Sequence, residues 1–317
     1  MTVKQFECES AERLNALLVR DPNAPYRAHR ELIGGDRYDN WAANRGAGLL
    51  CNATGAFEAE SGAIAWRTLP WDTAQFGFPA GRVDLLITAG SYGETRSAAS
   101  HLLQHALDHA TAHGIRHLVA RIDSTQVGHA HALAEDGFEL IDGIQTFALA
   151  LDAEALGAPP GTRPAETADG ERIAGIARTS FRFDRFHNDV AIGAEKADQL
   201  HESWARNSVS GVAADAVLLA VSGDSIDGFV TVKLDSSSND ALAVRIASIP
   251  LVAIAAEARG KGAARRATDA ALAWCSCRNV QIVEVGTQIS NVPAARLYQA
   301  AGFRTTGISL TYRRIIG

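Results

Sequence analysis

Apolar and polar positions follow the same order twice along this chain. An apolar strand-like run is followed by a polar turn, a short helix, a Gly-Phe pair and a last strand, and this order then returns. The two Gly-Phe pairs, which begin at 137 and 302, differ by 165 positions, and the same offset aligns two helical patterns. The matching segments are 113–151 with 278–315, and 97–114 with 262–279. One offset that covers two helices and two strands indicates two copies of one α/β unit.

The repeat and the composition together predict two domains. Residues 151–170 hold three of the nine prolines among small and polar residues, a composition that disfavours both a helix interior and a central strand. We therefore expect a domain at 1–150, a linker at 151–168 and a second domain at 169–317, with 1–68 left as an unassigned extension. The expected fold class is α/β (α+β), in which each copy has a mixed central sheet flanked by helices.

Composition and charge exclude several classes of protein. The chain has 317 residues, 47% of them hydrophobic, and a formal net charge of -6, which gives no general attraction to nucleic acid or an acidic membrane. Four cysteines are too few and too irregular for a disulfide framework and fit a reducing compartment. The first residues show no apolar signal-peptide core, and no window approaches the roughly 20 apolar residues of a membrane span. We expect a cytoplasmic protein.

A glycine turn within AEARGKGAARRATDAAL, residues 256–272, is the first candidate for chemistry. Gly260 and Gly262 permit backbone torsions and close approach that a Cβ would block. The amides of 260–264 would open a helix, where unpaired N–H groups attract an anion, and Arg259, Lys261, Arg265 and Arg266 add positive charge. The turn is neither a Walker loop nor a dinucleotide fingerprint, because no Gly-Lys-Ser/Thr follows and position 265 is Arg. A phosphate site is predicted, with a solvated helix start as the alternative.

Two elements in order resemble the GNAT acyl-CoA N-acyltransferase superfamily. They are R259-x-x-G262-x-A264 after an apolar strand, and SNVPAARLYQAAGF, which begins at 290. Further stretches from about residue 69 onward look like the dTDP-fucosamine acetyltransferase family. The resemblance implies tandem GNAT folds, acetyl-CoA as the acyl donor, and a primary amine of a small molecule as the acceptor, a nucleotide-linked amino sugar among them.

The resemblance also implies roles for individual residues. Tyr298 would protonate the leaving thiolate, and Asn291 would contact the cofactor or fix the helix that carries Tyr298. A backbone N–H of Val252 or Ala253 would polarise the thioester carbonyl. The residues that would bind the cofactor are Leu251, Val252, Ala253, Ile254, Arg259, Gly260, Lys261, Gly262, Ala263 and Ala264. The alternatives are a buried core tyrosine for Tyr298 and a helix N-cap for Asn291.

The acceptor side is less defined by the sequence. Candidates for the general base are Glu284, Asp184 and His187, each with a surface or structural role as the alternative. Trp204 and Asn207 match the family pattern and would line the acceptor site together with Asp184 and His187. A plain core role is the alternative for Trp204.

The first copy lacks these features. At the 165-residue offset, Glu94 stands where the second copy has Arg259, both glycines are missing, and Leu133 falls opposite Tyr298. We therefore expect the N-terminal copy to be degenerate, with scaffolding as its role, and the chain to bind one acyl-CoA.

No metal is expected from the patterns considered. His101, His105, His109 and His113 form a stripe at i, i+4 steps, but no HExxH or Cys/His cluster accompanies them, so a solvated face or an interface is favoured. Cys275-x-Cys277 is a poor ligand pair, because residues two apart on a helix do not face each other.

Two other functions stay open at this stage. One is a transferase of the same fold that takes an aminoacyl group from tRNA, which the net acidity disfavours. The other is a non-catalytic acyl-CoA-binding protein, which the retained Tyr298 disfavours. The expected partner is a small-molecule amine, with nucleic acid disfavoured and no membrane, and the oligomeric state, a homodimer included, is not determined by the sequence.

Overall fold

The computed structural model describes residues 2–152, 154 and 156–317, so residues 153 and 155 of the predicted linker lie outside the described residues. The chain forms two compact units. The first comprises Met1–Gly143 together with Ile308–Gly317, and the second comprises Ile144–Gly307. In the described part of the chain, no helix is long and apolar enough to span a bilayer.

The first unit is a mixed sheet with helices on both faces. Its strand order is β1-β2-β3-β4-β5-β13, antiparallel except for the parallel pair β4 and β5. The elements are β1 Lys4–Gln5, η1 Cys8–Ser10, α1 Ala11–Leu18, η2 Arg27–His29, α2 Arg30–Ile33, α3 Gly35–Cys51, β2 Gly55–Ala59, β3 Gly62–Thr68, α4 Pro70–Phe76, β4 Ala80–Thr88, α5 Tyr92–Ala112, β5 His117–Asp123, α6 Val127–Glu135 and β6 Glu139–Ala150. The unassigned residues 1–68 thus contribute three strands of this sheet.

Alternation along β3 supplies two separate cores. Ile64 and Trp66 pack into a cluster with residues of α5 and α6, whereas Ala63 and Ala65 pack into a second cluster with residues of α1 and α3. Successive side chains of a strand point to opposite faces, so an uninterrupted apolar run such as this one fits a sheet covered on both sides.

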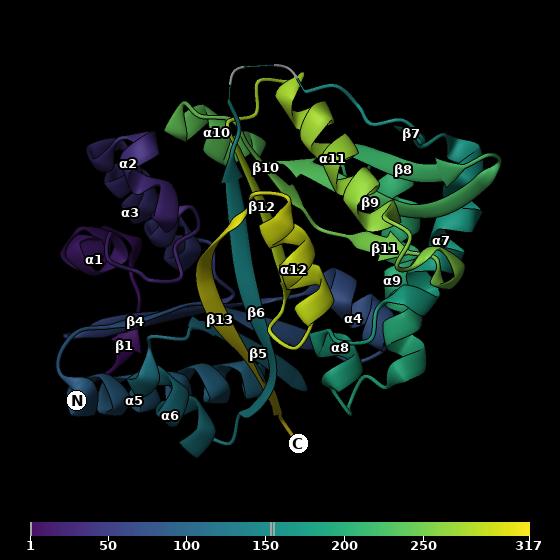
Figure 1. Cartoon of the computed structure of the whole chain (residues 1–317). Coiled ribbons are helices and arrows are strands. Elements are labelled where there is room, and N and C mark those ends of the chain that lie inside the picture. Colours follow the sequence, from purple (N-terminus) through teal and green to yellow (C-terminus); the bar gives the residue numbers. More distant parts are fainter. Residues whose placement is uncertain (1, 153, 155) are drawn as a thin grey trace. The chain divides into compact units, whose positions relative to one another are not determined.

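The second unit has the strand order β6-β12-β10-β9-β8-β7, with β11 paired to β9. Its other elements are β7 Thr162–Pro164, η3 Thr167–Asp169, α7 Gly170–Ser180, α8 Arg185–Asn188, α9 Ala194–Val209, β8 Ala216–Ser222, β9 Ser225–Leu234, α10 Ser236–Leu242, β10 Ile246–Ile249, β11 Val252–Ile254, η4 Ala256–Ala258, α11 Ala263–Ser276, β12 Ile282–Gln288, α12 Val292–Ala300 and β13 Arg304–Ile315. Figure 1 shows α11 and α12 in front of this sheet. The short strand β7 lies inside the predicted linker, at the sheet edge where Pro164 is tolerated.

The predicted repeat is confirmed by the elements themselves. Strand β5 and strand β12 begin at 117 and 282, helices α6 and α12 begin at 127 and 292, and strands β6 and β13 begin at 139 and 304. Each pair differs by 165 positions and has the same length. The two copies therefore share their final strand–helix–strand segment without an insertion.

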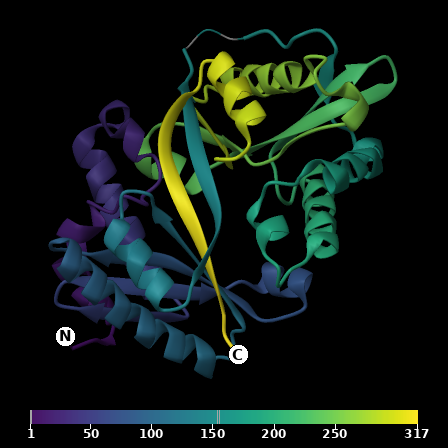
Figure 2. The same ribbon diagram turned by 60° about the horizontal axis from the view of Figure 1, so that its bottom comes forward.

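The last strands of the two copies are exchanged. Residues 144–150 of β6 pair with β12 of the second copy, and residues 309–315 of β13 pair with β5 of the first copy. Figure 2 shows these two long strands side by side, β6 in teal and β13 in yellow. Because of this exchange, the compact units of the structure do not end where the two sequence copies end. The boundaries 1–150 and 169–317 describe the copies of the repeat, and they stay a prediction.

Two of the four cysteines are paired. Cys8 and Cys51 form one disulfide that links η1 to the end of α3, whereas the sequence analysis excluded a disulfide framework and favoured a reducing compartment. Cys275 is buried and Cys277 is exposed, and both are free thiols. Two cysteines 43 positions apart carry no pairing signal in the sequence.

Candidate active site

Two parallel strands of the second unit separate beside Pro250. Strand β10 pairs with β12 over 246–249 and 282–285. After Pro250, β11 pairs with β9, whereas the remaining residues of β12, 286–288, pair with β6. Strand β11 and the end of β12 therefore diverge, beside the stretch Leu251–Ile254 that the resemblance implies as cofactor-binding.

The hydrogen-bond alternation of β11 selects one backbone amide. Thr231 N–H donates to the Leu251 carbonyl over 2.9 Å, and Ala255 N–H donates to the Asp227 carbonyl over 2.8 Å. In an antiparallel ladder such pairs recur every second residue, so Ala253 also bonds to β9, and the N–H of Val252 points the opposite way. Of the two amides considered, only that of Val252 faces the divergence of the strands.

The glycine turn opens a helix whose first amides are uncapped. Gly260 and Gly262 have φ of +73° and +81°, the left-handed region that favours glycine. Gly262 is the N-cap of α11, and no side chain caps that helix. The first backbone bond of α11 runs from Arg266 N–H to the Gly262 carbonyl, 3.1 Å, so the amides of 263–265 have no acceptor inside the helix. This is the geometry of an anion site.

The four positive side chains of the turn divide into two pairs. Arg265 pairs with Asp269 and also donates to the Ala300 carbonyl over 2.9 Å. Arg266 donates to Asp227 over 2.8 Å, so both these arginines are engaged within the protein. Arg259 and Lys261 are exposed beside the uncapped amides, and Arg259 Nε donates to the Ile254 carbonyl over 3.3 Å. The charge available to a phosphate therefore comes from Arg259 and Lys261.

Tyr298 lies on α12 in the core of the second unit. Its side chain is 3% exposed and its ring contacts the rings of Phe147 and Phe303, with centroids 5.7 Å and 5.9 Å away. Burial raises the pKa of the Tyr298 hydroxyl above its ordinary value, so the hydroxyl keeps its proton at neutral pH. The raised pKa makes the Tyr298 hydroxyl a weaker acid than a tyrosine in water.

Asn291 is the N-cap of the helix that carries Tyr298. Its side-chain oxygen accepts from Ala294 N–H over 3.3 Å, and its amide nitrogen donates to Thr287 Oγ1 over 3.1 Å. Both contacts fix the start of α12 against the end of β12. Asn291 is therefore a positioning residue in this structure, the second of the two roles considered for it.

Glu284 lies on β12 and carries a perturbed carboxyl group. Burial, with a smaller contribution from the charge of Asp235, raises the pKa of Glu284 to about 7. Glu284 pairs with Ser248 of β10 in the register, two residues before Pro250. A carboxylate that titrates near neutral pH has the acidity that general base catalysis requires.

Asp184 and His187 meet a third residue that the sequence analysis missed. Asp184 Oδ1 caps α8 by accepting from Phe186 N–H, while Asp184 Oδ2 lies 2.7 Å from His187 Nδ1 and 3.8 Å from His201 Nε2. His187 Nε2 lies 3.0 Å from Asp198. Both ring nitrogens of His187 therefore face carboxylate oxygens, which leaves neither free to accept a proton from an amine. The sequence signal that could have pointed to His201 is its place in the stretch LHESW, three residues before Trp204.

Trp204 and Asn207 lie three residues apart on α9 and make different contacts. The Trp204 ring stacks against His201 with centroids 6.3 Å apart and packs on the core, so it extends the Asp184 cluster. Asn207 instead accepts from the Val212 and Ala213 amides, 2.9 Å each, through its backbone carbonyl at the end of α9. The structure brings Asp184, His187 and Trp204 together, whereas the Asn207 carbonyl bonds to the turn that follows α9.

The first copy has a closed helix start at the corresponding place. Helix α5 begins at Tyr92, and Ser91 and Glu94 form a reciprocal capping box. Glu94 accepts from the Ser91 backbone N–H over 2.8 Å and from the Ser91 hydroxyl over 2.7 Å. A carboxylate thus occupies the helix start where the second copy leaves free amides, and Leu133 is fully buried where the second copy has Tyr298.

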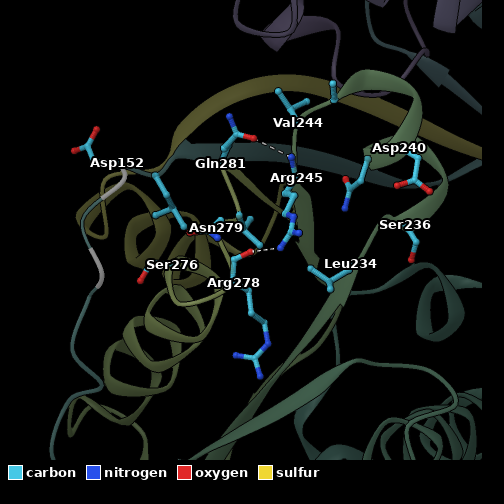
Figure 3. A pocket seen from close by; sticks show the side chains of 14 residues that line it. Asp152, Leu234, Ser236, Asp240, Val244, Arg245, Ser276, Arg278, Asn279 and Gln281 are labelled. Atoms are coloured by element: carbon cyan, nitrogen blue, oxygen red, sulfur yellow. Dashed lines mark hydrogen bonds between the residues drawn. The ribbon is translucent and has the colours of Figure 1, made fainter.

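A separate cavity of about 900 Å³ lies at the other end of α11. Arg245 donates there to the Arg278 carbonyl over 2.7 Å, and its backbone N–H donates to the Gln281 side chain (Figure 3). Because α11 has 14 residues at about 1.5 Å each, roughly 20 Å separates this cavity from the glycine turn. The cavity is therefore distinct from the anion site.

The histidine stripe on α5 is only partly a solvated face. His101, His105 and His113 are exposed, as predicted. However, the rings of His105, His109 and His113 also contact Phe57 or Trp66, with centroids 5.4 to 6.0 Å apart. Among the described residues, the stripe contributes no group of three metal-ligating side chains.

Comparison with known proteins shows that part of the second copy matches a known protein family. Residues 182–303 match the family described as acetyltransferase (GNAT) family. The chain is 26% identical over 185 residues to dTDP-fucosamine acetyltransferase of Escherichia coli O6:H1, covering 58% of this chain and 75% of that protein. It is 29% identical over 140 residues to a spore coat polysaccharide biosynthesis protein of Bacillus subtilis, covering 44% and 45%.

A third relative is the streptothricin acetyltransferase of Escherichia coli, 36% identical over 83 residues, 26% of this chain and 45% of that protein. The chain thus spans about half the length of the last two curated relatives. Among solved structures, an N-acetyltransferase from Sphaerobacter thermophilus matches with a TM-score of 0.59 at 17% identity, covering 99% of this chain and 95% of that one. A tandem GNAT protein of the clavulanic acid pathway matches with a TM-score of 0.54 at 16% identity, covering 100% and 98%. The predicted tandem fold is confirmed.

Proposed function

We propose that the protein, whose residues 182–303 match the GNAT acetyltransferase family, transfers an acyl group directly from acyl-CoA to a primary amine of a small molecule, with acetyl as the acyl group. The observation that carries this proposal is the joint geometry of one copy. Uncapped amides at the start of α11, diverging strands at Pro250 and a buried tyrosine on α12 occur together in the second copy, whereas the first copy has a capped helix start and Leu133 in the place of the tyrosine.

The residues divide the work of the transfer. The amides of 260–264, with Arg259 and Lys261, would bind the pyrophosphate, and Leu251–Ile254 would lie along the pantetheine arm. The Val252 N–H would donate to the thioester oxygen, a contribution of about 3 kcal/mol in comparable oxyanion sites. Glu284 would take the proton of the attacking amine, directly or through water. Tyr298 would donate its proton as the carbon–sulfur bond breaks, to a thiolate whose own basicity a dry site also raises.

The acceptor is proposed to be a nucleotide-linked amino sugar. Two relatives support this class by their names, a dTDP-fucosamine acetyltransferase and a protein of polysaccharide biosynthesis. The decisive experiment is a screen for CoA release from acetyl-CoA with nucleotide amino sugars and other small amines. Turnover with an amino sugar supports the proposal, and turnover with none of the amines, despite acetyl-CoA binding, would contradict it.

The chain should bind one acetyl-CoA. The Ser91–Glu94 capping box closes the helix start of the first copy and places a negative charge where a phosphate would lie. Isothermal titration calorimetry should therefore give a stoichiometry of about one, since α11 has uncapped first amides and the equivalent helix of the first copy, α5, does not. Two equivalent sites would overturn the view that the first copy is degenerate.

Gly262→Val should weaken acetyl-CoA without removing catalysis. The side chain would stand among the amides that face the phosphate, so we expect KM for acetyl-CoA to rise at least about tenfold, equal to about 1.4 kcal/mol if KM follows affinity, with kcat nearly unchanged.

Gly211→Val is the matched control for this experiment. Gly211 also has φ of +81°, and a Cβ there would meet nothing within 4 Å, so the variant has the same backbone strain at a site away from the turn. Its KM should stay at the parent value. If a folded Gly262→Val variant also keeps the parent KM, the glycine turn is not the phosphate site.

A further inference from the structure

A cluster of three potential metal ligands joins α8 to α9 and is not needed for the acyl transfer described above. Asp184, His187 and His201 each offer one ligand atom, and the three atoms lie within 4.8 Å of one another. We propose that these three side chains bind one divalent transition-metal ion of the Zn²⁺ type, which cross-links α8 to α9.

The first argument is that two unprotonated atoms, His201 Nε2 and Asp184 Oδ2, lie near each other. His201 Nδ1 lies 2.8 Å from the Ala197 carbonyl, which can only accept, so Nδ1 carries the proton. The lone pair of Nε2 then points at Asp184 Oδ2, which is 3.8 Å away, too far for a hydrogen bond. Ligands of a tetrahedral Zn²⁺ with bonds near 2.0–2.1 Å lie roughly 3.3 Å apart. The 3.8 Å pair would contract and the 2.7 Å pair of Asp184 Oδ2 and His187 Nδ1 would open, each by roughly 0.5 Å, to hold a cation.

The second argument is the outer contacts of both histidines. A metal-binding histidine commonly donates its other ring N–H to a carboxylate or a backbone carbonyl, which fixes the ring and its tautomer. His187 has Asp198 Oδ1 at 3.0 Å from Nε2, and His201 has the Ala197 carbonyl at 2.8 Å from Nδ1. Both rings are thus oriented with their remaining nitrogen toward Asp184 Oδ2.

The third argument is the rigidity and burial of the cluster. The side chains of Asp184, His187 and His201 are 10%, 7% and 3% exposed. The His201 ring stacks on Phe181 with centroids 4.2 Å apart and an interplanar angle of 15°. Asp184 uses one oxygen to cap α8, so its second oxygen is held in place for a ligand role.

The donor set selects the class of ion. Two imidazoles and one carboxylate suit Zn²⁺ and neighbouring first-row ions, whereas Ca²⁺ and Mg²⁺ prefer oxygen ligands alone. Three protein ligands leave one position for water. A competing arrangement without metal is a protonated His187 that bridges Asp184 and Asp198, and the experiment distinguishes the two.

The test is metal content and metal titration of the tag-free full chain. Elemental analysis after growth with added Zn²⁺ should find about one first-row metal ion per chain, and titration of the EDTA-treated protein with Zn²⁺ should show one site. Asp184→Asn keeps an oxygen for the N-cap but loses the charged ligand, and it should weaken Zn²⁺ binding at least about 100-fold. His201→Gln should do the same.

His101→Gln is the control, because His101 is exposed on α5 and contributes to no ligand group among the described residues. It should keep the Zn²⁺ affinity of the parent. EDTA should lower the Tm of the parent and leave the Tm of Asp184→Asn unchanged. Parent protein that binds no Zn²⁺ in titration, or an Asp184→Asn variant that binds Zn²⁺ as tightly as the parent, would overturn the proposal. The parent titration decides even where a variant fails to fold.

Discussion

Tyr298→Phe should lower kcat about 100-fold or more, the usual scale for a positioned proton donor. The ring stays and keeps its contacts with Phe147 and Phe303, so the fold and the amides of 260–264 are unaffected. Affinity for acetyl-CoA should therefore hold within about twofold, and kcat and kcat/KM should fall by the same factor, because the proton is delivered only as the thiolate departs.

Steady-state kinetics and calorimetry on the same preparation separate chemistry from binding. Tyr312→Phe is the control, since Tyr312 is another buried tyrosine, 7% exposed, on the part of β13 that belongs to the first unit. Its kinetics should match the parent. Normal turnover with poor acetyl-CoA binding in Tyr298→Phe would make Tyr298 a cofactor contact, and no change in either quantity would remove it from the mechanism.

Glu284→Gln should lower kcat/KM about 100-fold at pH 8 if Glu284 is the general base. The base must be ionised to accept a proton, so kcat/KM of the parent should rise with pH and level off above the Glu284 pKa of about 7. This acid limb should disappear in the variant. Glu257→Gln, at an exposed carboxylate of η4, is the control and should keep both the rate and the limb. A variant that retains the acid limb would place the base elsewhere.

Glu284→Gln should lower activity but raise stability, and this contrast separates a catalytic role of Glu284 from a packing role. The pKa of Glu284 is raised in the folded protein, so the native state binds the extra proton between about pH 4.5 and 7 and the free energy of unfolding falls as the pH rises through that range. Above pH 7 the parent carries a buried charge that glutamine avoids. Glu284→Gln should therefore have a higher Tm than the parent at pH 8, and a lower Tm would mean that the loss of activity reflects damaged packing.

Local sequence patterns predicted the helices and strands of this protein better than they predicted which strands pair with each other. The strand, helix and Gly-Phe order fixed β12, α12 and the start of β13, and the glycines of the turn have the left-handed torsions expected of them. These features depend on neighbours in sequence. The exchange of β6 and β13 could not be predicted, because β5 and β12 are equivalent edges of the repeat and both last strands have the same length.

Side-chain clusters were predictable only in part. Asp184 and His187 were found because they lie together in the family-like stretch DRFHND, whereas His201 joins them only through the packing of α8 on α9. Cys8 and Cys51 are joined by the fold of the unassigned extension. Burial of Glu284 and Tyr298, which sets the direction of both pKa shifts, likewise depends on contacts made by distant strands and helices.

The exchanged strands also have a consequence for the order in which the chain folds. Strand β5 ends at Asp123, but its partner in β13 begins near Ser309, so nearly the whole chain must leave the ribosome before the first sheet can close. Pairing over so long a separation is slow, because the entropy of loop closure must be overcome first. Until then β5 presents an unpaired edge, the kind of surface that promotes misassembly between nascent chains.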